Sequence, residues 1–465
     1  MKTNSLLIRR TLCIPVMIMM IAVSSCTKNF LDKKPDQSLL VPTTLKDFRA
    51  LLDANSDMNV APYLNMVATD DIYTTEEGLL SADYLIRNSY TWEKDIYQSQ
   101  TDYNWNIPYQ QVFYANVVLD GLENFTPEAG EQAEFNEIKG AALFYRSFAF
   151  YNLAQQFAAA YVPATAEQVP GIPVRLSSDV NIKSGRGTLK GTYGQMVNDF
   201  TEAEALLPEQ ANFATRPTRA AAAAMLARVY QTMQDFGHAR EAADAAIRSP
   251  ASLMDYNDFS ETVLRPFPKL FPVNGNTEVL FYSPLISNAS FLISPSLTFI
   301  DSVLYRSYDE KDLRRTLFFK PGTEGMLFRG NYTNGVNVFA GIALDEVYLI
   351  RAEAYARLGN TAAAMADLNT LLRKRWRKAA YTDMSAADPD AALSIILEER
   401  RKELVYRNLI RWTDLKRLNQ EPRFAVTVRR VINGKTYILQ PGDPKYAFPI
   451  PDDEISRSGI EQNPR

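Results

Sequence analysis

The stretch VYLIRAEAYARLGNTAAAMADLNTLL, residues 347–372, decides the fold class of this protein. Its apolar and small residues recur with helical spacing on both sides of Gly359, which predicts helices over 343–359 and 361–376. Gly359 stands where a helix end needs left-handed backbone, so it marks the turn between them. The alanines let the two helices approach closely, and such a pair can bury its apolar face only by stacking on neighbours.

A second stretch repeats this scheme. The run AAAAMLARVYQTMQDFGHAREAADAAI predicts helices over 218–236 and 238–249, with the turn at Gly237. Further amphipathic patterns predict helices over 110–125, 135–161 and 192–208. The sequence therefore predicts a mostly α fold of degenerate tetratricopeptide-like helical repeats, in which long irregular insertions interrupt the period of roughly 34 residues. A generic helical bundle is the alternative.

Two regions lack the helical pattern. The longest insertion runs from about 249 to 341 and is rich in Pro, Asn and aromatic residues, so we expect few helices there. Near the C-terminus, the run 423–443 places Asn433-Gly434 between two β-prone segments, which predicts a small β-hairpin with a type I′ turn. We expect residues 46–465 to form one domain that contains the insertion.

The first 25 residues have the composition of a secretory signal. A basic segment precedes an apolar run that is too short to span a bilayer, and VSSC then ends at Cys26. This ending is similar to the lipobox of bacterial lipoproteins, in which cleavage before the cysteine is followed by its acylation. We therefore expect a lipoprotein signal peptide over 1–25, a lipid on Cys26 and a lipidated polar tether over 26–45. An ordinary signal peptide with a chance cysteine is the alternative.

The composition limits the chemistry of the protein. A net charge of −4 argues against a globally basic nucleic-acid binder, so we expect no nucleic-acid partner. The chain has only one His and two Cys. These residue types are the ones most used for transition-metal ligation and general-base catalysis, so their scarcity argues against such chemistry. His238 has no assignable nucleophile or orienting carboxylate. A pair of carboxylates suited to glycoside cleavage stays open among the 54 acidic residues, but we expect no enzyme and no metal site.

The motif EERRKEL, residues 398–404, is the most charged in the sequence. On a helix, Arg400 shares a face with Ile396 and Leu404, so we expect it to point inward and to pair with carboxylates. Buried arginine clusters of this kind usually hold a fold together. We therefore interpret the motif as a structural charge cluster and not as a catalytic site. Its members are Glu399, Arg400, Arg401 and Glu403.

The segment 83–105 interleaves aromatic and polar side chains without a clean apolar stripe, which is typical of an exposed loop. Sugars present flat apolar faces and rings of hydroxyls, so their binders combine aromatic faces with Asn, Asp, Gln or Arg. We expect ligand contacts from this segment and weaker ones from the insertion. The candidates are Tyr84, Asn88, Tyr90, Trp92, Tyr97, Tyr103, Asn331 and Tyr332. The alternative is that these side chains belong to the core, which we expect for Trp105, Tyr109 and Phe113.

A series of motifs along nearly the whole chain is similar to those of the SusD/RagB glycan-binding lipoproteins of the Gram-negative outer membrane. The motifs are CTKNFLDKKP (26–35), WNIPYQQVFYANVVL (105–119), AALFYRSFAFYNLAQQF (141–157), YDEKDLRRTLFF (308–319), ILEERRKELVYRNLIRWTDLKR (396–417) and AFPIPDDEI (447–455). Their order and number carry the resemblance. One departure is Asn408, which stands where the family usually has Gly; Asn tolerates left-handed backbone, so a helix end can survive there.

The resemblance implies a lipid-anchored protein on the cell surface, in the outer membrane. Such a protein binds oligosaccharide and delivers it to a TonB-dependent SusC-like transporter, with glycan contacts on loops in a region that includes 83–103. Some members of the family hold calcium, but this sequence gives no ligand set, so we expect no cofactor. One alternative is that the same importer captures peptides or another nutrient. The others are a lipoprotein enzyme that acts on surface polymers and a non-catalytic repeat scaffold.

Overall fold

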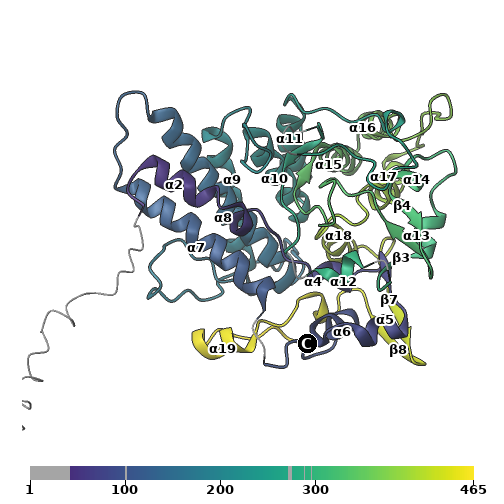
Figure 1. Ribbon diagram of the computed structural model, residues 1–465, viewed down its shortest axis with the longest axis horizontal. Coiled ribbons are helices and arrows are strands. Elements are labelled where there is room, and N and C mark those ends of the chain that lie inside the picture. The colour runs from purple at the N-terminus through teal and green to yellow at the C-terminus, as the bar shows by residue number, and fades with distance from the viewer. Residues whose placement is uncertain (1–41, 100–101, 271–274, 287–288, 295) are drawn as a thin grey trace, which may run out of the picture. The chain divides into compact units, whose positions relative to one another are not determined.

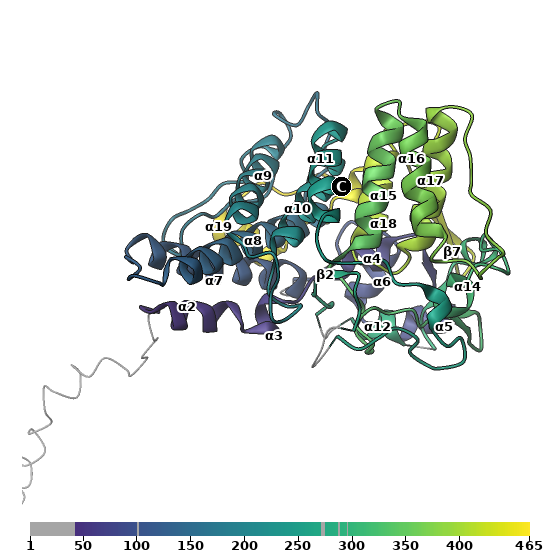
Figure 2. The same ribbon diagram turned by 90° about the horizontal axis from the view of Figure 1, so that it is seen from above.

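Two helix pairs form the centre of the fold (Figures 1 and 2). The computed structural model describes residues 42–99, 102–270, 275–286, 289–294 and 296–465. Helix α10 (Arg219–Thr232) packs against α11 (Phe236–Ile247), and α15 (Leu344–Arg357) packs against α16 (Thr361–Leu372). Helix α11 also packs on α15, which joins the two pairs. The predicted stacking of helix pairs is confirmed.

The row of helices extends on both sides of this centre. Helices α7 (Tyr103–Glu123), α8 (Gln132–Phe157) and α9 (Leu189–Leu206) follow one another in space and reach α10, whereas α17 (Pro389–Glu403) covers α15 and α16. Helix α8 is buried without interruption from Gly140 to Phe157 because neighbours surround it. Its apolar residues therefore show no single stripe, as expected for a helix inside a core. The mostly α, repeat-like fold class is confirmed.

Short elements fill the remaining space. The helical ones are α2 (Leu45–Leu52), α3 (Asn55–Met58), α4 (Leu64–Ala68), α5 (Glu76–Ser81), α6 (Tyr84–Tyr90), η2 (Tyr256–Asp258), α12 (Ser290–Ile293), α13 (Ser302–Arg306), α14 (Arg314–Leu317), α18 (Ile410–Leu418), η3 (Pro444–Tyr446) and α19 (Asp452–Ser458). The strands form antiparallel pairs: β1 (Ile72–Tyr73) with β3 (Phe299–Ile300), β2 (Val279–Phe281) with β6 (Ile342–Ala343), β4 (Phe319–Pro321) with β5 (Met326–Phe328), and β7 (Val428–Ile432) with β8 (Lys435–Leu439). As expected, the insertion contains only short elements.

Of the three predicted turns, two are confirmed and one is wrong. Gly359 has a φ of 82°, and Asn433 and Gly434 have φ values of 49° and 72°, so the helix end and the type I′ hairpin are confirmed. The prediction for Gly237 is wrong. Helix α11 already begins at Phe236, because the Asp235 side chain caps it by accepting from the backbone N–H of His238.

Asn408 itself does not take left-handed backbone. Left-handed backbone occurs on either side of it, at Tyr406 (φ 60°) and Leu409 (φ 64°). Asn408 is buried, and its side-chain oxygen accepts a hydrogen bond from Asn65 Nδ2 at 3.1 Å. The Tyr406 hydroxyl donates to the carbonyl of Leu292 at 2.6 Å. Such tertiary contacts hold a conformation that costs a non-glycine residue about 1–2 kcal/mol.

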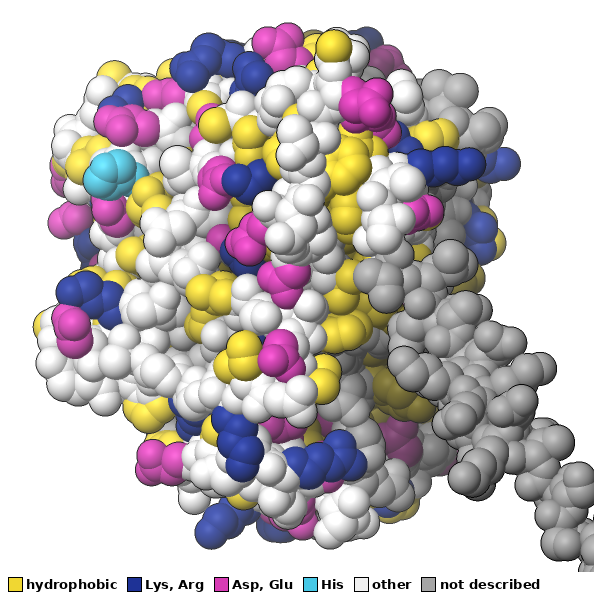
Figure 3. All heavy atoms as spheres, turned by 90° about the vertical axis from the view of Figure 1, so that its left-hand side faces the viewer, with side chains coloured by type: hydrophobic (Ala, Val, Ile, Leu, Met, Phe, Trp, Pro, Cys, Tyr) yellow, Lys and Arg dark blue, Asp and Glu magenta, His cyan; other side chains and the backbone are white. Residues whose placement is uncertain are grey.

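Residues Thr43–Arg465 form one compact unit. The predicted signal segment, Cys26 and nearly all of the tether lie outside the described residues. Within the part of the chain that the structure describes, no helix is both long and apolar enough to cross a membrane. On the face shown in Figure 3, acidic and basic side chains are interspersed without a large area of one sign.

Candidate functional site

The aromatic segment that follows α5 is largely buried. Tyr90, Trp92 and Tyr97 expose only 2%, 1% and 2% of their surface, so the prediction that these rings face the solvent is wrong. Trp92 Nε1 donates to the carbonyl of Ala68 at 3.1 Å, and the Tyr97 hydroxyl donates to the carbonyl of Pro449 at 2.8 Å. In this arrangement the rings are not available for stacking against a sugar.

Arg430, which comes from strand β7, lies against two of these three rings. Its guanidinium carbon lies 3.5 Å from the ring centroid of Tyr90 and 4.5 Å from that of Trp92. The guanidinium donates to the backbone carbonyls of Tyr90, Val67 and Thr69, and it makes no ion pair among the described residues. Burial lowers the pKa of Arg430 to about 10. Cation–π contacts and carbonyl oxygens therefore replace a carboxylate as partners of this charge.

The other predicted contacts are scattered. Tyr103 is 57% exposed, Tyr84 and Asn88 are half-buried, and Asn88 Nδ2 donates to the carbonyl of Asp95. Tyr332 is fully buried: its hydroxyl donates to Glu278 Oε2 at 2.6 Å, and Arg407 lies 3.8 Å above its ring, so this candidate is wrong as an exposed contact.

The three residues that we expected in the core differ in their burial. Trp105 is buried at 2% exposure, as expected, and Tyr109 is partly buried. Phe113 is 38% exposed, so its assignment to the core is wrong. It lies on α7 and is not among the buried residues of that helix.

Asp102 caps helix α7 at the end of this segment. The carboxylate accepts from the backbone N–H of Asn104 at 3.0 Å and from its Nδ2 at 2.8 Å, and the residue is 1% exposed. No cation pairs with it among the described residues. Burial raises the pKa of Asp102 to about 6, although the hydrogen bonds from Asn104 act in the opposite direction. The cap therefore holds a carboxylate in a site that favours its protonated form.

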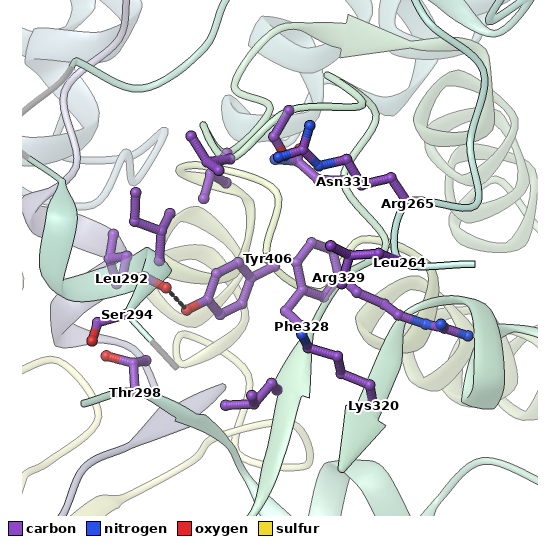
Figure 4. A pocket seen from close by; sticks show the side chains of 15 residues that line it. Leu264, Arg265, Leu292, Ser294, Thr298, Lys320, Phe328, Arg329, Asn331 and Tyr406 are labelled. Carbon is purple, nitrogen blue, oxygen red and sulfur yellow. Dashed lines mark hydrogen bonds between the residues drawn. The ribbon is translucent and has the colours of Figure 1, made fainter. Parts of the chain in front are cut away.

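A cavity of about 200 Å³ opens in the insertion (Figure 4). Its walls come from the loop at Leu264, helix α12, strands β4 and β5, and the loop 331–338. One side chain, Tyr406, reaches it from the turn between α17 and α18. Of the sequence-predicted contacts, only Asn331 lines this cavity.

Two stacked rings form one side of the cavity. The ring centroids of Phe328 and Tyr406 lie 4.7 Å apart with an angle of 24° between the ring planes. The hydrogen bond from the Tyr406 hydroxyl to the Leu292 carbonyl fixes the second ring (Figure 4). Burial raises the pKa of that hydroxyl above its ordinary value, so it stays a donor. An apolar wall beside a few polar groups is the usual chemistry of a small-molecule site, and the uncharged polar side chains here are those of Ser294, Thr298 and Asn331.

Sequence reasoning missed Phe328 and Tyr406. Phe328 lies in an insertion whose aromatic richness was visible, but no local pattern separates it from the buried rings around it. Tyr406 belongs to the charged motif region, which drew attention for its arginines. Only the tertiary contact between these two rings places them together in the cavity wall, where Phe328 is partly buried and Tyr406 is 5% exposed.

The predicted charge cluster ties the insertion to the helices. Glu403 of α17 accepts from Arg375 at 2.7 Å and from Arg314 at 3.1 Å, and Arg314 also contacts Glu399 at 2.5 Å. Arg375 in turn pairs with Glu278, which precedes β2, at 2.8 Å. These side chains are at most 4% exposed. Because each of these groups lies against at least one opposite charge and is hydrogen-bonded to it, the cluster can persist without solvent.

The predicted orientation of Arg400 is confirmed. It is 2% exposed and pairs with Asp414 of α18 at 2.9 Å. Arg401 lies nearer the surface and contacts Asp70 at 3.1 Å and Asp71 at 3.2 Å. His238 pairs with Asp235 at 2.7 Å on the surface. In the described residues, no three His, Cys, Asp or Glu side chains are grouped to hold a metal ion.

Comparison with known proteins gives consistent matches. A family model described as starch-binding proteins that associate with the outer membrane matches residues 29–231, and a model of the SusD family matches 344–465. SusD-like protein P2 of Formosa agariphila is 24% identical over 355 residues, which are 62% of this chain and 66% of that protein. The chain thus spans about two thirds of the length of this curated relative.

Solved structures share the fold. A SusD superfamily protein of Bacteroides thetaiotaomicron has a TM-score of 0.74 at 22% identity and covers 91% of this chain and 100% of its own. A protein of Bacteroides vulgatus described as a putative sugar-binding protein has a TM-score of 0.73 at 21% identity, with 91% and 99% covered. The chain belongs to the SusD family. Proteins of this family bind carbohydrate in nutrient uptake and are not enzymes.

We predict that Trp92→Ala lowers the free energy of unfolding by about 3–5 kcal/mol, because it removes a buried ring that supports Arg430. The control Tyr103→Ala removes an exposed ring and should change the free energy by about 0.5 kcal/mol or less. Urea unfolding of both variants measures the difference. Loss of ligand binding by Trp92→Ala at unchanged stability would instead make Trp92 a contact residue.

We predict that Asp102→Asn removes part of the pH dependence of stability. The folded-state pKa of about 6 lies above the ordinary value of 3.8, so the folded protein holds this proton more tightly than the unfolded chain. The contribution of this group to the free energy of unfolding is fully present below pH 3.8 and is lost as the pH rises through 6. The amide cannot ionise and keeps Oδ1 as the cap acceptor. Between acidic and neutral pH, the variant should gain roughly 3 kcal/mol relative to wild type in urea unfolding. Parallel pH curves for the two proteins would contradict this.

Proposed function

We propose that this protein is a surface lipoprotein of the outer membrane that captures oligosaccharide and passes it to a TonB-dependent SusC-like transporter. The single observation that carries the ligand part is the cavity with the stacked Phe328–Tyr406 rings. An aromatic face beside hydroxyl and amide groups suits the C–H faces and hydroxyls of a pyranose. Membership in a family of carbohydrate-binding uptake proteins supports the same conclusion.

The role is binding without turnover. The cavity is lined by aliphatic, aromatic, amide, hydroxyl and cationic side chains, and no carboxylate is among its described lining residues. Retaining and inverting glycosidases both use a pair of carboxylates across the scissile bond. The cavity therefore offers a surface for holding a sugar and not the acid–base pair that would cleave it.

The proposed location in the outer membrane rests on the N-terminal sequence. A basic segment, an apolar run and VSSC ending at Cys26 support export, cleavage and acylation. Several acyl chains at about 0.8 kcal/mol per buried methylene would anchor the protein permanently. The polar residues between Cys26 and the first described helix would let the domain reach a transporter in the same membrane.

We predict that Phe328→Ala weakens glycan binding by about tenfold or more, because it removes one of the two stacked rings. Isothermal titration of the protein with a panel of glycans measures this. The matched control is Phe113→Ala, which removes an exposed ring on α7, remote from the cavity walls, and should bind as wild type does. Circular dichroism confirms that both variants fold. Equal affinities of Phe328→Ala and wild type would place the glycan elsewhere, and binding of peptides but no glycan would overturn the carbohydrate assignment.

We predict that Cys26→Ala abolishes membrane anchoring, since the thiol and new amino group are the proposed acylation points. Wild type should stay in the outer-membrane fraction after a salt wash, and the variant should leave it. Cys13→Ala, which changes the other cysteine within the proposed signal segment, should still be anchored. Mass spectrometry of the N-terminal peptide reports the lipid directly. Retention of Cys26→Ala in the membrane would refute this attachment point.

A further inference from the structure

The cavity in the insertion carries a charge of one sign. Its described lining residues include the three cations Arg265, Lys320 and Arg329, and they include no aspartate or glutamate. The whole chain has a net charge of −4, so this local excess runs against the overall composition. The surface in Figure 3, where both signs are mixed, shows the more usual distribution.

The three cations are not equivalent. Arg329 uses its guanidinium within the protein: it donates to the carbonyls of Thr316 at 3.0 Å and Val263 at 2.7 Å, and to that of Glu261. In Figure 4 this guanidinium points away from Tyr406. Arg329 therefore shapes the wall and contributes charge, but it offers no free donor toward the cavity.

Lys320 and Arg265 have N–H donors without a partner among the described residues. Lys320 is half-buried on β4, and its ammonium makes no hydrogen bond or ion pair with another described residue. In Figure 4 its side chain extends toward Phe328. Arg265 is exposed, and its single hydrogen bond within the described chain goes to the carbonyl of Asn334 at 3.3 Å. Neither side chain has a carboxylate within 4 Å in that part of the chain.

Other arginines nearby are neutralised. Arg314 and Arg375 meet carboxylates in the buried cluster, and Arg377 contacts both carboxylate oxygens of Glu261 at 2.7 Å. The carboxylate of Glu261 is therefore already engaged and does not compensate the cavity. An unneutralised ammonium beside an apolar ring pair attracts an anionic group, because the low local dielectric strengthens the interaction.

We propose that the ligand of this cavity is an acidic oligosaccharide, with a sugar ring on the Phe328–Tyr406 pair and a carboxylate or sulfate group at Lys320 and Arg265. This rests on the proposed function, namely that the cavity binds glycan. Both anionic groups accept charge-assisted hydrogen bonds from ammonium and guanidinium donors. The aromatic pair supplies the contact common to all pyranoses, and the two cations select the charged ones.

The test uses the full-length protein and isothermal titration with three short oligomers: a galacturonate oligomer, its methyl ester and a sulfated galactan oligomer. The methyl ester keeps the sugar ring and removes the charge. At about 0.05 M salt an acidic oligomer should bind about tenfold more tightly than the ester. The preference should shrink at about 0.5 M salt, where screening is stronger. A preference for the uronate or for the sulfate identifies which anionic group the site takes.

Variants assign the effect to the cavity. Lys320→Gln should remove most of the preference for the acidic oligomer and leave affinity for the ester unchanged, whereas Lys320→Arg should preserve the preference. Lys183→Gln is the matched control, since it removes an exposed lysine from the loop between α8 and α9. Equal affinity of wild type for acidic and neutral oligomers overturns this inference but leaves the proposed function intact. Failure of every glycan, neutral or acidic, overturns both.

Discussion

Glu403 holds two buried arginines at once, and the placement of the insertion depends on it. Arg375 follows α16 and Arg314 lies in the insertion, so the carboxylate joins the repeat helices to a region that has few hydrogen-bonded elements of its own. Removing ions from water costs several kcal/mol each, and the cost is recovered only where every charge finds its partners. The complete set of partners is reached in one arrangement of the insertion, so the cluster fixes both its position and the cavity within it.

Another buried arginine fixes the N-terminal segment in a different way. Arg430 has no carboxylate partner among the described residues and is instead held between Tyr90 and Trp92. Tyr90 and Arg430 are 340 residues apart along the chain. Aromatic faces and backbone carbonyls solvate the charge there. Guanidinium groups therefore attach the insertion to the helices and the N-terminal segment to strand β7. They present several donors in a fixed plane and can join segments that share no regular secondary structure.

The comparison of sequence and structure separates local from long-range information. The helix pairs, the hairpin at Asn433-Gly434 and the inward direction of Arg400 follow from spacing within one element, and each was predictable. The burial of Tyr90 and Trp92 was not predictable, because a strand from the far end of the chain covers them. Aromatic and polar residues alternate in the same way in an exposed loop and in a buried segment whose cover lies elsewhere in the sequence.

The same distinction explains how the cavity is built. Tyr406 comes from a turn of the helical scaffold, where Arg407 pairs with Asp345 at 2.8 Å, and its left-handed backbone is therefore held by the core. Phe328 and Lys320 come from the insertion. One ring is thus supplied by the scaffold, whereas the second ring and the charges are supplied by the insertion. In the proposed function, the insertion therefore supplies the selectivity for the ligand, and the scaffold supplies one ring of the surface that the ligand contacts.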